Sequence, residues 1–130
     1  MTGLVVVTHA GLATSLIAAV RMITGTTDFS EAVELHADDP AEGLVARLGE
    51  ALVRVGSDNA VIMTDMFGGT PSNAAMSFLK EGKVEVVTGV NLPMMVEYFS
   101  RRERMTLEQL CGSLQRCGRE SVIVAGEFLK

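Results

Sequence analysis

Hydrophobic positions along the chain form two kinds of pattern. Short unbroken apolar runs rich in β-branched residues are typical of strands that are covered on both faces. Between them, apolar residues recur every three or four positions, as in helices with one buried face. The unbroken runs predict strands at Leu4–Val7, Ala32–His36, Ala60–Thr64, Val84–Thr88 and Ser121–Ala125. The spaced patterns predict helices at Leu12–Ile23, Ala41–Val55, Pro71–Lys80, Leu92–Arg102 and Thr106–Cys117.

The order of these elements predicts the architecture. Strands that alternate with helices are typical of an α/β fold with a mainly parallel sheet and right-handed crossovers. The sequence therefore predicts a single domain over residues 1–130, a three-layer sandwich with the strand order 2-1-3-4. The last strand follows two helices, so we expect it to be an antiparallel edge strand, on its own subunit or on a neighbour's.

Composition narrows the class of protein and its partners. The chain is 48% hydrophobic and 21% charged, as in a compact folded domain. The net charge of -5 argues against a nucleic-acid partner. The basic cluster Arg101, Arg102 and Arg104 is interpreted as a solvated helix end.

No stretch approaches the ~18 to 20 apolar residues that cross a bilayer, so no membrane insertion is expected. The start lacks the basic segment of a signal peptide, and we expect a cytoplasmic protein.

The two cysteines do not predict a disulfide or a zinc site. Cys111 and Cys117 are six positions apart, which places them on different sides of a helix. They form no CxxC pair and have no histidine nearby in the sequence. Reduced thiols in the cytoplasm are therefore expected.

A histidine and an aspartate follow two of the predicted strands. His9 lies beyond the first strand and Asp65 lies beyond the third. Ligands of open α/β sheets bind at the carboxyl ends of the strands, and strands one and three are neighbours in the order 2-1-3-4. We therefore expect the two side chains to meet. A carboxylate that accepts a hydrogen bond from Nδ1–H leaves Nε2 free as a nucleophile, which can attack a carbonyl or a phosphoryl centre.

The glycine-rich segment after the third strand favours the phosphoryl centre. Gly68 and Gly69 allow backbone N–H groups to approach a ligand closely. Thr70 is expected to be the N-cap of the next helix, and Pro71 its first residue. The first helix also begins at a glycine, so two helix N-termini would converge on the outward face of His9. Each offers N–H donors and partial positive charge, which suits a phosphoryl group.

The residues of this site also have simpler interpretations. A single histidine or aspartate after a strand is more often a capping or core residue. A metal hydrolase is disfavoured, because His9 and Asp65 supply two ligands where a catalytic zinc usually has three. No metal and no organic cofactor are expected. His36 ends the second strand, far from the proposed site, and is interpreted as structural or merely exposed.

Three segments, in order, resemble a known family: VVVTHAGLATSL, VIMTDMFGGTPSNAA and VVTGVNLPMMVEY. They are similar to the IIA component of mannose-family permeases in the bacterial phosphoenolpyruvate-dependent sugar phosphotransferase system. The resemblance implies that His9 accepts a phosphoryl group from the carrier HPr and passes it to a IIB component in sugar uptake. It implies that Asp65 orients this histidine and that Thr70 donates its hydroxyl to the phosphate.

The resemblance also implies an assembly, and it leaves the role of the chain open. The family is usually dimeric, with a C-terminal strand exchanged between subunits, here Val122–Gly126. Two positions differ from many relatives: Phe67 stands where tryptophan is common, and Ala10 separates the histidine from the next glycine. The alternative to sugar uptake is a stand-alone regulatory module whose phosphorylation state controls its binding to other proteins.

Further residues near the site have two interpretations each. Asn91 immediately precedes a predicted helix, so it either caps that helix or contacts phosphate or a partner. Met66 and Phe67, with Met94 and Met95, would form an apolar rim for docking proteins. Core packing is the alternative for Met94 and Met95.

Overall fold

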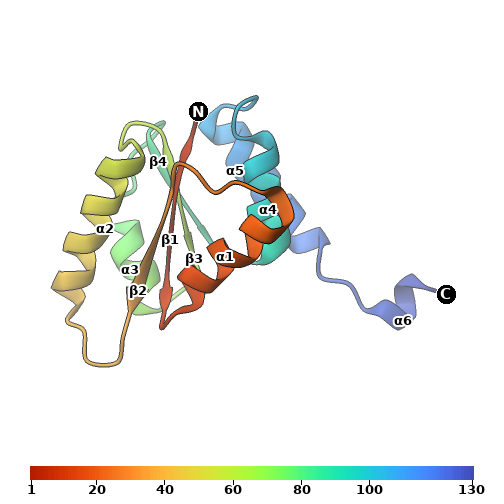
Figure 1. Ribbon diagram of the computed structural model, residues 1–130, viewed down its shortest axis with the longest axis horizontal. Helices are drawn as coiled ribbons and strands as arrows, with labels where there is room; N and C mark the ends of the chain where they lie inside the picture. The colour runs from red at the N-terminus through yellow and green to blue at the C-terminus, as the bar shows by residue number, and fades with distance from the viewer.

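Four parallel strands form the sheet at the centre of the molecule, in the order β2-β1-β3-β4 (Figure 1). The computed structural model describes all residues from 1 to 130. The strands are β1 (Gly3–His9), β2 (Ser30–Leu35), β3 (Ala60–Thr64) and β4 (Val84–Thr88). The helices are α1 (Leu12–Thr24), α2 (Ala41–Val55), α3 (Thr70–Met76), α4 (Leu92–Arg101), α5 (Leu107–Glu120) and α6 (Ala125–Phe128). The predicted parallel sheet and its strand order are confirmed.

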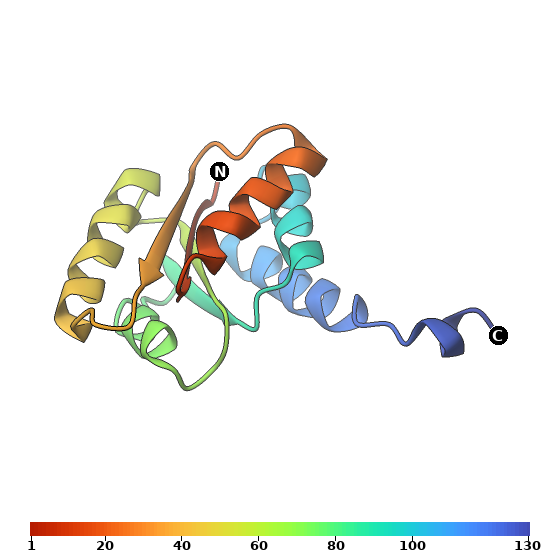
Figure 2. The same ribbon diagram turned by 60° about the horizontal axis from the view of Figure 1, so that its bottom comes forward.

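Two hydrophobic cores lie on opposite faces of the sheet. Alternate residues of a strand point to opposite faces, so Leu4 and Val6 pack in the core under α1, α4 and α5. Val5 and Val7 pack in the other core, under α2 and α3. Figures 1 and 2 show these two helical layers on either side of the strands. This confirms the predicted three-layer sandwich and explains why β1 and β3 are unbroken apolar runs.

Helix α3 is shorter than the sequence pattern predicts. It was expected to continue to Lys80, but it ends at Met76. The Ser77 hydroxyl donates to the carbonyl of Ala74, which competes with the helical bonding pattern. Lys80 then pairs antiparallel with Val84 at the start of β4, which draws the backbone out of the helix.

None of the helices combines the length and the apolar character that a transmembrane helix requires.

The C-terminal segment does not form the strand predicted for Ser121–Ala125. Helix α5 continues to Glu120, and residues 122–124 have no strand partner in the chain. One turn of helix, α6, follows, and Figures 1 and 2 show this segment extending away from the body of the molecule. The apolar side chains of Val122 and Val124 are 78% and 70% exposed. A strand needs a partner to satisfy its backbone groups, and this chain alone provides none.

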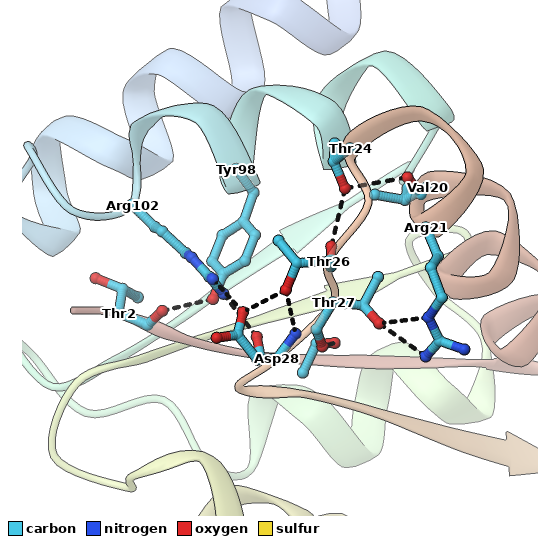
Figure 3. A network of polar contacts seen from close by, with 10 residues as sticks. Thr2, Val20, Arg21, Thr24, Thr26, Thr27, Asp28, Tyr98 and Arg102 are labelled. Atoms are coloured by element: carbon cyan, nitrogen blue, oxygen red, sulfur yellow. Dashed lines mark hydrogen bonds and ion pairs between the residues drawn. The ribbon is translucent and has the colours of Figure 1, made fainter.

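A network of polar contacts closes the N-terminal edge of the sheet (Figure 3). Arg102 is only 6% exposed, so its interpretation as part of a solvated helix end was wrong. Its guanidinium donates to the backbone carbonyl of Asp28 at 2.6 Å and to the carboxylate of the same residue at 2.5 Å. It also lies 4.8 Å from the ring centroid of Phe99 and 5.6 Å from that of Tyr98. The Tyr98 hydroxyl donates to the carbonyl of Thr2, which ties α4 to the start of β1.

Candidate functional site

His9 and Asp65 meet at the carboxyl edge of the sheet, 56 positions apart in the chain. Strands β1 and β3 are hydrogen-bonded neighbours with Val7 opposite Thr64, so the residues that follow them leave the sheet side by side. The His9 Nδ1 atom lies 2.7 Å from Oδ2 of Asp65. The imidazole is 49% exposed and the carboxylate 13%, so the pair opens to solvent on the side of the ring.

Hydrogen bonding determines which ring nitrogen carries the proton. Oδ2 of Asp65 also accepts from the backbone N–H of His9 at 3.0 Å, and Oδ1 accepts from the N–H of Met66 at 3.1 Å. Partial burial raises the pKa of the Asp65 carboxyl, but the hydrogen bonds from the His9 ring and backbone outweigh it, and the net pKa is lowered. The ionised carboxylate can only accept, so Nδ1 is the protonated nitrogen and the Nε2 lone pair is free.

Ala10 sets the direction of the chain after the histidine. Its φ of 49° lies in the left-handed region, which costs a residue with a Cβ atom some strain. Its N–H donates to the carbonyl of Leu35 in β2 at 2.7 Å. The strained turn therefore holds β1 against β2 directly beside His9.

The glycine-rich segment packs against the free edge of the imidazole. A Cβ atom at Gly69 would lie 3.0 Å from Cε1 of His9 and 3.5 Å from Nε2, so a side chain there would displace the ring. Gly68 has a φ of 95°, which favours glycine for a different reason, its backbone conformation. Both glycines are therefore needed to bring the loop to the ring.

The free donors of the site come from residues 69 and 70. Helix α3 begins at Thr70 with Gly69 as its N-cap, one residue earlier than predicted, so Thr70 is not the cap. The N–H groups of Gly69 and Thr70 and the Thr70 hydroxyl have no acceptor in the chain. In the first turn of α1, Ala13 N–H donates to the Thr8 hydroxyl at 2.8 Å and the Thr14 hydroxyl donates to Glu34 Oε2, so these two groups are not free for a ligand.

A cavity of about 500 Å³ lies beside the His9 imidazole, and a second histidine, His36, is among its lining residues. Its lining residues are His9, Ala10, Leu35, His36, Ala37, Asp39, Ala41 and Thr70. Strand β2 pairs with β1 so that Leu35 lies opposite His9, and His36 follows directly. The interpretation of His36 as far from the site was therefore wrong. The predicted strand order 2-1-3-4 could have placed His36 near His9, because it makes strand two the second neighbour of strand one.

The residues expected at a docking rim separate into two groups. Met66 and Phe67 are 56% and 71% exposed next to Asp65, whereas Met94 and Met95 are buried in the core. Asn91 caps α4 by accepting from the N–H of Met94 at 3.0 Å, and its amide donates to the Gly118 carbonyl at 2.9 Å. The helix-capping alternative is thus the one that the structure shows for Asn91. Histidine, cysteine and acidic side chains form no group of three that would hold a metal ion.

These features define a class of protein: an α/β domain whose parallel sheet carries, at its carboxyl edge, a solvent-exposed imidazole hydrogen-bonded to a carboxylate. The family model described as "PTS system fructose IIA component" matches residues 3–115. The chain belongs to this family, the mannose-type IIA components of the phosphotransferase system.

Individual relatives agree with this assignment. The chain is similar to a PTS system fructose-specific EIIA component of Bacillus subtilis, with 30% identity over 100% of this chain and 90% of that protein. A mannose/sorbose-specific IIA subunit from Enterococcus faecalis has 27% identity and a TM-score of 0.85, over 95% of this chain and 93% of that one. An EIIA component from Streptococcus agalactiae shares the fold, with a TM-score of 0.90 at 18% identity over 98% and 99% of the two chains.

Proposed function

We propose that the chain is a cytoplasmic phosphohistidine carrier that accepts a phosphoryl group from HPr and passes it to a IIB component in sugar uptake. Nε2 of His9 attacks the phosphorus atom of the donor phosphohistidine. A new P–N bond forms as the donor's P–N bond breaks, and the donor imidazole leaves with its electron pair. The reverse exchange delivers the same group to the acceptor.

Each residue of the site has a role in this transfer. The ring of His9 gains positive charge as the new bond forms, and the Asp65 carboxylate at 2.7 Å stabilises that charge through Nδ1–H. The unpaired N–H groups of Gly69 and Thr70, with the Thr70 hydroxyl, would donate hydrogen bonds to the phosphoryl oxygens. Gly68 supplies the turn that brings these donors to the ring.

The observation that carries the proposal is the contact between His9 and Asp65 with Nε2 left free beside unpaired donors. Incubation with phosphoenolpyruvate, enzyme I and HPr should give a phosphoprotein that is labile in acid and stable in alkali. His9→Ala should remove the label without changing the fold, since the side chain is half exposed. A label that persists in His9→Ala would overturn the proposal.

A regulatory module remains the alternative function, because Met66 and Phe67 expose apolar surface directly beside the site. Such a surface suits a protein that docks there, and phosphorylation would change its charge. Pull-downs with wild type, His9→Asp and His9→Ala distinguish the two functions. Capture of a partner that depends on phosphorylation, with no transfer to any IIB component, would favour regulation. Efficient transfer to IIB would favour sugar uptake.

We also propose that the carrier is a homodimer in which residues 122–126 of each subunit pair with the sheet of the other. Strand β4 bonds only to β3, and a cavity of about 320 Å³ lies along β4 beside α5. The apolar residues 122–124 are exposed and have no strand partner in their own chain. Sedimentation should show a dimer for the full chain and a monomer for a chain that ends at Ser121. A dimer that survives this truncation would contradict the exchange.

A further inference from the structure

We propose that His36 is a second functional imidazole of this site, which supplies the positive charge that a phosphoryl group meets beside His9, and that Glu34 positions it. This inference rests on the proposed phosphorylation of His9. It assigns a role to a residue that no part of the transfer chemistry above uses.

The backbone places His36 at the site and holds it there. Leu35 lies opposite His9 in the β1–β2 ladder, and Ala10 donates to the Leu35 carbonyl at 2.7 Å. The N–H of His36 donates to Oδ2 of Asp39 at 2.9 Å, and the N–H of Asp39 donates to the carbonyl of His36 at the same distance. The turn that carries this imidazole is therefore bonded on both sides.

A carboxylate also fixes the side chain of His36. Its Nε2 lies 2.9 Å from Oε1 of Glu34, and the other oxygen of this carboxylate accepts from the Thr14 hydroxyl at 2.5 Å. The Thr14 hydroxyl bond, with a smaller contribution from His36, lowers the pKa of the Glu34 carboxyl, which is therefore ionised at neutral pH. An acceptor-only partner makes Nε2 the protonated nitrogen, and Nδ1 has no partner in the chain. His9 is also held by a carboxylate, but there Asp65 takes Nδ1 and leaves Nε2 free.

His36 is the one residue of the cavity lining, apart from His9, whose side chain can carry a positive charge. Among the other lining residues, Asp39 is acidic. Arg47, which is not a lining residue, donates to Asp39 Oδ2 at 3.2 Å and to the Glu34 carbonyl at 2.7 Å. A cation that faces a dianionic group beside these carboxylates would offset their repulsion, in addition to the hydrogen bonds from Gly69 and Thr70. Because His9 is the acceptor, His36 in its protonated form would be that cation.

Phosphoramidate tests this role without any partner protein. This anionic reagent transfers its phosphoryl group to an imidazole: the P–N bond to nitrogen of the reagent breaks, ammonia leaves, and a P–N bond to Nε2 of His9 forms. The second-order rate constant should be measured from pH 5.5 to 8.5 at low salt for wild type and His36→Gln. The ratio of the two rate constants cancels the intrinsic pH dependence of the reagent and of His9. Mass spectrometry should locate the label on His9, because a label on His36 would overturn the assignment.

The expected ratio is roughly 3- to 10-fold in favour of wild type at the acid end, from the attraction of unit charges a few ångströms apart in water. The ratio should fall toward one as the pH rises and the imidazole loses its positive charge. His36→Lys should keep the advantage at all pH values, and Glu34→Gln, which no longer requires the proton on Nε2 of His36, should reduce it. Lys83→Gln removes one positive charge at the opposite edge of the sheet and should behave as wild type.

A ratio that stays constant with pH, or a His36→Lys rate no higher than that of His36→Gln, would show that His36 is only an exposed partner of Glu34. His36 is exposed, so these variants should keep the melting temperature of wild type. The assay also distinguishes the proposed carrier function from the role proposed for His36. Failure of transfer from HPr with the rate ratio intact would remove the carrier function and leave the charge assignment in place.

Discussion

The two edges of the sheet use polar groups in opposite ways. At the N-terminal edge, the guanidinium of Arg102 is buried beside two aromatic rings, and it donates to both the carbonyl and the carboxylate of Asp28. Figure 3 shows these groups directed at one another. At the carboxyl edge, His9 Nε2 and the donors of Gly69 and Thr70 have no partner in the chain.

This difference separates the edge whose polar groups are satisfied within the chain from the edge whose polar groups are free. A polar group that is satisfied within the chain contributes to folding, whereas an unpaired one near the surface is available to a ligand. Substitutions at the N-terminal edge should therefore change stability and leave transfer intact. Substitutions at the carboxyl edge should change transfer and leave stability nearly intact.

Asp65→Asn should produce the largest effect. Asparagine can donate as well as accept, so it no longer requires the proton on Nδ1 of His9, and it does not stabilise the cationic ring. We expect phosphoryl transfer to fall by about 10³–10⁴-fold, the loss typical of removing a carboxylate that orients a reactive histidine. Rapid-quench measurement of the label on His9 checks this. Asp58→Asn, at the other edge, is the matched control and should transfer at the wild-type rate.

Gly69→Ala should have the next largest effect. The backbone there is extended, with φ of -93°, so alanine fits its conformation, but its Cβ would lie 3.0 Å from Cε1 of His9. A displaced ring should slow transfer by roughly 10- to 100-fold. Gly112→Ala introduces the same methyl group into an exposed helical position with nothing within 4 Å, and should leave the rate unchanged. Equal rates for wild type and Gly69→Ala would contradict the close packing of this loop.

Arg102→Met should give the largest loss of stability. Methionine keeps much of the aliphatic packing but removes the hydrogen bonds to Asp28 and the cation above the aromatic rings. We expect the free energy of unfolding in urea to fall by about 1–3 kcal/mol. Transfer at a temperature where the variant is folded should match wild type. A large loss of transfer would show that the two edges are coupled.

The contribution of Asp28 should depend on pH. The hydrogen bond from Arg102 is the main reason that the pKa of the Asp28 carboxyl is lowered from 3.8. A lowered pKa in the folded state means that the stabilisation is complete above the unfolded value and is lost as pH falls through the folded one. Wild type should therefore be more stable than Asp28→Asn at neutral pH, and the difference should shrink below about pH 4. Urea unfolding of both proteins between pH 2.5 and 7 measures this, and a difference that grows in acid would contradict it.

Ala10→Gly should have the smallest effect, with the opposite sign. Glycine adopts the φ of 49° at that position without strain, so we expect stability to rise by about 0.5–1 kcal/mol and transfer to change little. Ala18→Gly, at an exposed position within α1, should instead lower stability by a similar amount. If both substitutions destabilise the protein, the left-handed turn after His9 is not strained.

Much of the fold follows from local patterns in the sequence. The runs Ala60–Thr64 and Val84–Thr88 and the helix Ala41–Val55 were predicted with the bounds that the structure has. Unbroken β-branched runs and one-sided apolar stripes are local signals. The strands, the helices and the parallel arrangement of the sheet can therefore be predicted from the sequence without knowledge of long-range contacts. The pairing of His9 with Asp65 followed from the strand order, because both residues lie at the ends of neighbouring strands.

The sequence by itself determined the α/β class, the strand order and the residue that ends β3, because these depend on periodicity and chain order. Only the tertiary structure decided the burial of Arg102 and the unpaired state of residues 122–124. Each of these depends on a contact between segments far apart in the chain, or on the absence of such a contact. A charged side chain has the same local sequence pattern whether it meets water or a buried carbonyl, so only the packed molecule distinguishes the two.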